Sequence, residues 1–134
     1  MKLTVFTPLG TALKSKINKV TLETLSGYHT LLPKHIDFAA AMRANVVVYT
    51  TEDGAEKYVA CHHGIVVKKG EYVTITVQDA VTGDTLDELS EVISRDFKQN
   101  DEKRKELNSA MARLELGIMR GFGRLNKGDN DGGI

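Results

Sequence analysis

The spacing of apolar residues changes once along this chain of 134 residues, at Gly83. Up to Val81, short apolar runs alternate with polar residues at a period near two, which is typical of half-buried β-strands. From Thr85 onward, apolar residues recur at every third or fourth position, the spacing of one face of an α-helix. The pattern predicts a β-rich body followed by helices. This organisation favours a part that docks on other proteins over an enzyme built around its own cleft.

Turn residues divide the first part of the chain into about eight short strands. Residues 52–54 (EDG) and 68–71 (KKGE) each predict a hairpin loop between two apolar runs. Residues 8–10 (PLG) end the first run, and Pro33 ends or bends a later one. Short strands with turns about every eight to twelve residues predict an antiparallel β-sandwich or barrel over residues 1–83.

Residues 84–125 carry two amphipathic helical patterns joined by a short turn. Thr85 and Glu88 form a capping box, in which each side chain accepts a hydrogen bond from a backbone N–H at the helix start. Asn100 and Asp101 supply the turn and a cap for the second helix. Two stripes joined by so short a turn predict an antiparallel helical hairpin, which needs a docking surface for stability. The stripes consist of Leu86, Leu89, Ile93 and Phe97, and then of Leu107, Met111, Leu114, Ile118, Phe122 and Leu125.

The composition narrows the choice of compartment and partner. A chain of this length forms one domain and buries a core without covalent staples. Its single Cys61 excludes an internal disulfide framework and favours a reducing compartment. No apolar stretch reaches the roughly 18 residues of a transmembrane helix, and the alternating N-terminus is no signal peptide. Because the formal net charge is zero, we expect neither nucleic-acid binding nor lipid insertion.

The second helical pattern is basic, whereas the first is acidic. Arg113, Arg120 and Arg124 fall on one face, which is either a solvated helix face or a basic strip that meets an acidic partner. Gly117 and Gly121 each cost about 1 kcal/mol of helix stability relative to Ala, so they mark either the helix end or a segment built to rearrange. We expect residues 126–134, rich in Gly, Asp and Asn, to be disordered.

One cluster has metal-ligand chemistry, at Cys61, His62 and His63. On a strand, Cys61 and His63 would share a face and His62 would point the other way. Zinc takes three or four ligands, and no second Cys/His pair follows to complete a site. A structural role is therefore favoured, with a small metal-dependent hydrolase as the rival from the enzyme class.

Three segments and their order resemble the epsilon subunit of F-type ATP synthases. Residues 27–35 (GYHTLLPKH) match the family's Gly, aliphatic pair, Pro and His between early strands. Residues 5–10 (VFTPLG) match its opening strand and turn. Residues 64–67 (GIVV), followed by Ala80, Thr82 and the Leu86-Asp87 helix start, match a later hairpin and the start of its helices. The resemblance extends from about Lys2 to Leu125.

This resemblance implies a mainly β protein with helices added: a sandwich of about ten strands at residues 1–83, then a regulatory helical hairpin at 84–125. It implies a non-catalytic stalk subunit that couples rotation of the membrane ring to ATP synthesis, without cofactor or metal. The sandwich would bind the gamma subunit and the c-ring. The helices would extend towards the alpha/beta head to inhibit ATP hydrolysis. The complex would lie peripherally at the cytoplasmic face of a bacterial or archaeal plasma membrane and transport protons or sodium ions.

The same resemblance implies roles for particular residues. Thr7 and His35 become candidates for the side that faces gamma. The three arginines of the second helix become the candidate inhibitory face. The candidate loop for contact with the membrane ring consists of Gly27, Tyr28, His29 and Thr30.

Two departures from the family pattern bear on nucleotide binding and on the lineage within the family. Members that bind ATP on the helices open the first helix with an aliphatic residue, Asp, two variable residues and Arg-Ala. This chain has Ser90 and Glu91 in the last two places, so we expect no tight ATP binding. The loop at residues 28–31 also lacks the common Gly-Ile, a feature similar to an alternate F-type lineage. A β-sandwich adaptor unrelated to ATPases is the rival from the binding class.

Overall fold

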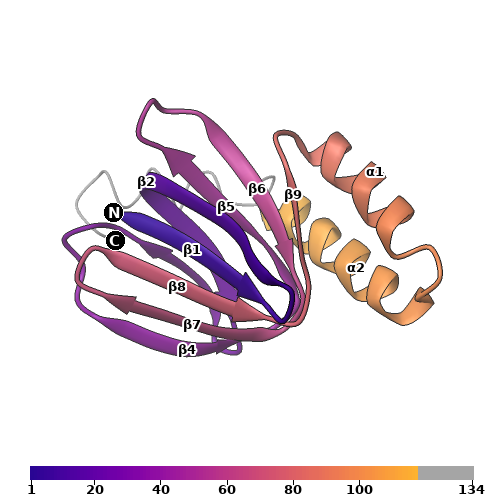
Figure 1. The fold of residues 1–134 in the computed structure, drawn as a ribbon, viewed down its shortest axis with the longest axis horizontal. Helices are drawn as coiled ribbons and strands as arrows, with labels where there is room; N and C mark the ends of the chain where they lie inside the picture. The colour runs from indigo at the N-terminus through magenta and orange to yellow at the C-terminus, as the bar shows by residue number, and fades with distance from the viewer. Residues whose placement is uncertain (118–134) are drawn as a thin grey trace.

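The structure, a computed structural model, describes residues 1–117 as a two-layered β unit with two helices against one outer face (Figure 1). The predicted fold class is confirmed. The strands are β1 (Lys2–Thr7), β2 (Gly10–Thr24), β3 (Gly27–Leu31), β4 (Phe38–Met42), β5 (Asn45–Thr51), β6 (Glu56–Cys61), β7 (Gly64–Lys69), β8 (Tyr72–Val77) and β9 (Ala80–Gly83). The helices are α1 (Leu86–Asp96) and α2 (Asp101–Gly117).

Strand pairing defines the two layers. The first layer contains the first half of β2, then β1, β8, β7 and β4. The second layer contains β3, the second half of β2, β5, β6 and β9. A single paired position, Thr24 with Met42, joins β2 to β4 and closes the sandwich at one corner.

Strand β2 belongs to both layers, which accounts for the difference between the observed number of strands and the number that the resemblance implies. Its residues up to Lys16 pair with β1, whereas Ile17 already lies opposite Thr51 of β5. The register shifts between Ile17 and Lys19, and the intervening Asn18 donates from Nδ2 to the Thr51 carbonyl over 3.3 Å. The strand therefore bends and doubles back at this point (Figure 1). Residues 1–117 contain nine strands, and β2 pairs as two of the ten strands that the resemblance implies.

The pairing of β1 with β8 departs from the antiparallel expectation, because these two strands are parallel. The N-terminal strand lies between its own hairpin partner β2 and the later hairpin β7–β8. Strands that are not joined by a tight turn are free to pair in parallel. The tight hairpin loops predicted from EDG and KKGE are present, and Gly70 adopts φ +60° in the second of them.

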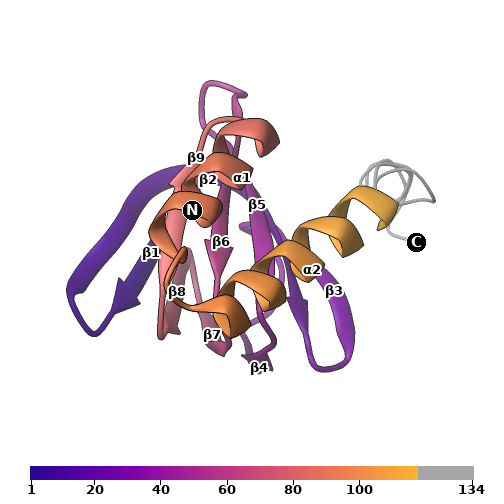
Figure 2. The ribbon, with the colours of Figure 1, turned by 90° about the vertical axis from the view of Figure 1, so that its right-hand side faces the viewer.

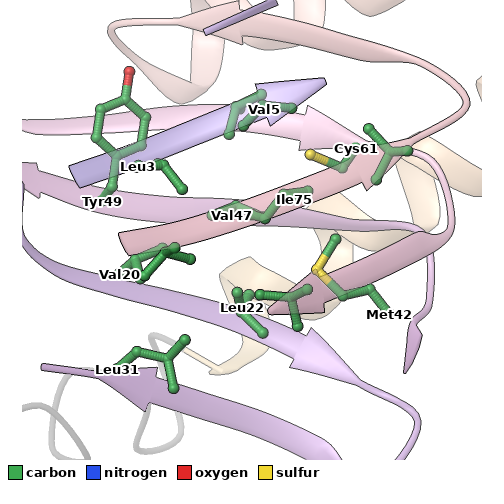
Figure 3. Packing of buried hydrophobic residues seen from close by; sticks show 14 of the residues in the cluster. Leu3, Val5, Val20, Leu22, Leu31, Met42, Val47, Tyr49, Cys61 and Ile75 are labelled. Carbon is green, nitrogen blue, oxygen red and sulfur yellow. The ribbon is translucent and has the colours of Figure 1, made fainter. Parts of the chain in front are cut away.

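The sandwich interior holds the larger of two apolar clusters, here called the inner cluster. Side chains from both layers, such as Val47 and Ile75, meet there (Figure 3). Burial of apolar surface of this kind supplies the main stabilisation of a domain. The buried members are Leu3, Val5, Ile17, Val20, Leu22, Leu31, Met42, Val47, Tyr49, Val59, Cys61, Val66, Val73, Ile75 and Val77.

Strand β5 is buried on both faces, which accounts for its unbroken apolar run. Val47 and Tyr49 face the inner cluster, whereas Val46 and Val48 face the helices. The second group forms the outer cluster, whose other buried members are Ala60, Leu89, Ile93, Leu107, Ala110, Met111 and Leu114. The helices lie side by side over the second layer, and the chain turns back between them (Figure 2).

The helix starts agree with the predicted caps. Thr85 Oγ1 accepts from the Glu88 N–H over 3.1 Å, and Asn100 Oδ1 accepts from the Lys103 N–H over 3.1 Å. The Glu88 carboxylate reaches back to the Asp84 N–H at 3.3 Å, one residue earlier than a capping box predicts. Of the second predicted stripe, Leu107, Met111 and Leu114 are buried, and the positions from Ile118 onward lie outside the described residues.

Candidate functional site

The three residues considered as possible metal ligands lie in three different surroundings. Cys61 lies in the inner cluster, where burial raises the pKa of its thiol to about 12. His62 is buried against α2, with its Nε2 atom 2.9 Å from Glu106 Oε2. His63 is exposed and lies just beyond the end of β6, so strand alternation does not govern its direction. No group of three metal-ligating side chains occurs within residues 1–117, and the metal-site rival is not supported.

The two residues predicted to face gamma lie at opposite ends of the sandwich. Thr7 ends β1, in the hairpin with Gly10, where its hydroxyl oxygen accepts from the Leu9 N–H over 3.2 Å. His35 lies in the loop before β4, beside the β7–β8 hairpin at the other end of these strands. The structure therefore does not bring Thr7 and His35 together at one site.

A buried lysine fixes the loop that carries His35. Lys68 is 1 % exposed, and its Nζ donates to the His35 carbonyl over 2.7 Å and to the Gly70 carbonyl over 2.8 Å. The Asp37 carboxylate accepts from the Gly70 N–H over 2.9 Å. Sequence reasoning missed Lys68, although its place two residues after the inward-facing Val66 indicates an inward direction on a strand.

The outer face of the first layer is mainly apolar, with threonines among its central positions, and no described element covers it. Side chains of alternate residues on β1, β8, β7 and β4 line up there, so Phe6 lies opposite Thr76 and Thr76 opposite Ile65. Phe6 is 40 % exposed and Ile65 56 %. We call this surface the uncovered face. It consists of Thr4, Phe6, Ala39, Ala41, Ile65, Val67, Tyr72, Thr74 and Thr76.

Lysines border the uncovered face. Lys2 and Lys69 lie beside Tyr72 in the register of β1, β8 and β7, and Lys14 and Lys16 of β2 lie beside β1. The strand segments that build this layer contain no Asp or Glu, whereas the acidic residues Glu52 and Glu71 lie in hairpin loops beside Lys2 and Lys16. The surface therefore matches a partner with an apolar centre and an acidic border.

The predicted loop for contact with the membrane ring forms strand β3 instead. It pairs with β2, so that Tyr28 lies opposite Glu23 and His29 opposite Leu22. Tyr28 packs against the outer cluster, and burial raises the pKa of its phenol to about 12. The His29 ring lies 5.0 Å from the Phe38 ring. The exposed part of this region is the β2–β3 turn, where Leu25 is 76 % exposed.

Of the predicted basic face, Arg113 lies within the described residues, while Arg120 and Arg124 lie outside them. The Arg113 side chain contacts the sandwich. Its Nε donates to Glu23 Oε1 over 3.1 Å, and its Nη2 donates to the Ala44 carbonyl over 2.6 Å. The Lys103 Nζ atom donates to Asp79 Oδ2 over 2.6 Å, and His62 Nε2 lies 2.9 Å from Glu106 Oε2. Together with these two contacts, the Arg113 contact ties α2 to the sandwich.

The start of α1, where some relatives of the resembled family bind ATP, carries mixed charge. An open groove of about 730 Å³ lies there, lined by Asp87, Ser90, Glu91, Ser94, Arg95 and Lys98. Four acidic or hydroxyl residues come first along the helix, and two basic residues follow near its end. The groove therefore presents no cluster of cations to a triphosphate.

Comparison with known proteins agrees with the sandwich and with the helices. Residues 1–83 match the family model described as ATP synthase, Delta/Epsilon chain, beta-sandwich domain. The chain is 27 % identical over 126 residues to the ATP synthase epsilon chain of Bacillus licheniformis, covering 94 % of this chain and 95 % of that one. It is 27 % identical over 117 residues to the chloroplastic epsilon chain of Daucus carota, covering 84 % and 87 %.

Solved structures share the fold at low identity. A chain in the mitochondrial ATP synthase of Euglena gracilis, solved with its F1 and c-ring, superposes with a TM-score of 0.62 at 16 % identity. The match covers 87 % of this chain and 79 % of that one. A chain in the central stalk and c-ring of the Tetrahymena thermophila enzyme gives a TM-score of 0.54 at 14 % identity, covering 83 % and 96 %.

Neither α1 nor α2, the two helices in the described part of the chain, has the length and apolar character of a membrane-spanning helix. The family match covers the whole two-layered unit, and the match to the Bacillus licheniformis epsilon chain extends over 94 % of this chain. The protein is thus a member of the ATP synthase delta/epsilon chain family, with residues 1–83 as its beta-sandwich domain.

Proposed function

We propose that this chain is the epsilon subunit of the central rotor stalk of an F-type ATP synthase. It helps couple rotation of the membrane ring to ATP synthesis in the catalytic head and contributes no catalytic residue. The observation that carries the proposal is the match to epsilon chains across the sandwich and the helices together, over 95 % of one relative's length. The subunit belongs at the membrane peripherally, on the cytoplasmic face of a bacterial or archaeal cell, in a complex that transports protons or sodium ions.

The uncovered face is the proposed binding surface for gamma. Exposed apolar residues gathered on one sheet face, here Phe6, Ile65 and Val67, commonly mark an interaction surface. The opposite face of the sandwich is occupied by the chain's own helices, so a partner of the rotor has the uncovered face available. The lysine border adds electrostatic steering toward an acidic rim on gamma. In this arrangement Thr7 and His35 lie at the two ends of the binding surface and not at its centre.

The end of the sandwich at the β2–β3 turn is the proposed contact with the c-ring. It contains Gly27 and the exposed Leu25, and β3 holds Tyr28, His29 and Thr30 in fixed positions behind the turn. A cysteine placed at Ser26 should cross-link to the ring subunit in assembled complexes. A cysteine at Glu52, in the hairpin at the opposite end, is the matched control and should not.

The gamma contact is tested by charge insertion on the uncovered face. Ile65→Lys should weaken the binding of gamma by about tenfold or more, because it places a cation at the apolar centre of the interface. Leu116→Lys changes an apolar residue of similar exposure on α2 and should leave gamma binding unchanged. Equal loss with both variants, measured by surface-immobilised gamma, would contradict the assignment.

The helices are proposed to regulate the enzyme and to be dispensable for gamma binding. A chain without residues 85–134 should keep a folded sandwich that still binds gamma, because the inner cluster involves no helix. Circular dichroism and the same binding assay check this. Non-cooperative unfolding of the shortened chain, or failure to bind gamma, would show that the helices are part of the stalk's structural core.

A further inference from the structure

The carboxylate of Glu23, near the end of β2, faces two guanidinium groups from two different elements. One belongs to Arg113 of α2 and the other to Arg43 in the turn between β4 and β5. We propose that Glu23 is an exchangeable receptor. Arg113 occupies it while α2 is docked, and Arg43 takes it over when α2 leaves the sandwich. Its meaning for regulation rests on the proposed function, whereas the exchange itself is a property of the isolated chain.

The contact with Arg113 is largely withdrawn from water. The Glu23 side chain is 9 % exposed and the Arg113 side chain 29 %. Arg113 makes two bonds here, to Glu23 Oε1 at 3.1 Å and to the Ala44 carbonyl at 2.6 Å. Undocking of α2 breaks both of these bonds, and hydrogen bonds between charged groups are stronger than those between neutral groups. Undocking therefore has its largest electrostatic cost at this carboxylate, unless another cation replaces Arg113.

Arg43 offers the compensation that undocking requires. Its Nη1 lies 3.6 Å from Glu23 Oε2, the carboxylate oxygen that does not receive the Arg113 Nε bond. This separation is longer than a hydrogen bond, so the attraction is only partly used while α2 is docked. The Arg43 side chain is 50 % exposed, and only a small shift would bring it within hydrogen-bond distance of Glu23.

A buried amide holds Arg43 near Glu23 whether or not the helix is present. Asn45 is fully buried, its Oδ1 accepts from the Glu23 N–H over 3.0 Å, and its Nδ2 donates to the Arg43 carbonyl over 2.6 Å. All three residues belong to the sandwich. Departure of α2 therefore removes Arg113 and the cover of the site, but it leaves the second guanidinium in place.

The exchange lowers the free energy needed to undock α2, and undocking frees Arg113 to bind another acidic surface. In the docked state Arg113 is unavailable to any partner because Glu23 and the Ala44 carbonyl hold it. The other polar contacts of α2, Lys103 with Asp79 and Glu106 with His62, each include at least one side chain that is about one-third exposed or more. Of the three carboxylates at these contacts, Glu23 is the least exposed, at 9 % against 31 % for Asp79 and 42 % for Glu106. Glu23 is therefore the carboxylate for which a second cation matters most.

Hydrogen exchange on the full-length chain, followed by mass spectrometry, tests the proposal through the amides of α2. Arg113→Gln should reduce their protection by about tenfold, the effect of losing one charge-assisted bond. Arg43→Gln should act in the opposite direction and raise protection about threefold or more, because undocking would then leave Glu23 unpaired. Arg95→Gln changes an exposed arginine of α1 and should leave α2 unaffected.

The sign of the Arg43→Gln effect decides the proposal. Reduced or unchanged protection of α2 in that variant would overturn it, since both arginines would then simply add to docking. Amides of β8 in the same samples report whether a variant has lost the sandwich itself, and Arg113→Lys provides a conservative second variant.

ATP hydrolysis by the assembled enzyme is a separate readout. Unchanged hydrolysis with the expected exchange results would refute the regulatory role and leave the receptor standing.

Discussion

The two outer faces of the sandwich are similar in their apolar character and differ in what covers them. The second layer presents Val46, Val48 and Ala60, and the chain's own helices bury all three. The first layer presents Phe6, Ile65 and Val67, and no described part of the chain covers them. The cover of the second layer comes from the same chain, whereas the proposed cover of the first layer is another molecule. One domain therefore combines a self-occupied surface with a surface reserved for a partner.

Substitutions that remove apolar volume should show the largest difference between the two faces. Leu107→Ala, in the outer cluster, should cost about 2–5 kcal/mol of the free energy of α2 docking, because the side chain is 1 % exposed and leaves a cavity. Hydrogen exchange of the α2 amides measures the change. Val67→Ala on the uncovered face should alter the free energy of unfolding by about 0.5 kcal/mol or less. Comparable losses in both variants would mean that the faces are equivalent in the isolated chain.

A smaller effect is expected where α1 approaches the sheet. Gly83 ends β9, and a Cβ atom there would lie only 3.1 Å from the Leu89 backbone nitrogen. Gly83→Val should therefore push α1 away and cost about 1–3 kcal/mol. Thermal unfolding followed at helix and strand wavelengths checks this. An unchanged midpoint would show that α1 shifts along the sheet without penalty.

Alkaline pH should weaken the covered face through its tyrosines. Burial raises the pKa of Tyr28 and of Tyr58 to about 12, from about 10 in the unfolded chain. A group whose pKa is higher in the folded state contributes stability that is complete below pH 10 and is lost as pH rises to about 12. Tyr28→Phe should flatten this part of the pH profile of helix docking. A profile as steep as that of the unaltered chain would assign the effect to other groups.

The smallest effect is expected from nucleotide. Ser90 and Glu91 stand where ATP-binding relatives of the family carry Arg and Ala, and the groove there has acidic residues at its N-terminal side. Calorimetry with ATP and magnesium should show no tight binding and no change in helix protection. Micromolar affinity for ATP would contradict this expectation and would mean that nucleotide binding stabilises the docked helices.

The sequence was sufficient for features that depend on local periodicity. The strand and helix patterns, the hairpin turns at residues 52–54 and 68–71, and the Thr85 cap were all predictable from it. The parallel pairing of β1 with β8 was not, since it joins residues about seventy positions apart and leaves no local pattern. The change of direction within β2 also has no strong local signal, because neither Gly nor Pro stands at Asn18.

The candidate surfaces were harder to predict than the fold. Family resemblance placed Thr7 and His35 on one side, but the structure sets them at opposite ends of the same strands. The pairing of Glu23 with Arg113 spans ninety residues, and the sequence around a single glutamate in a strand does not indicate which residue will pair with it. The uncovered face emerged only once the register showed which alternate side chains share it.

The doubled strand β2 gives the domain a mechanical property. Because one continuous backbone runs from the layer with the uncovered face into the layer beneath the helices, covalent bonds join the two sheets as well as side-chain packing. A shearing load applied at one surface is therefore transmitted along the polypeptide to the other. The sheets of such a unit resist sliding past one another, a suitable design for a component that must turn without deforming.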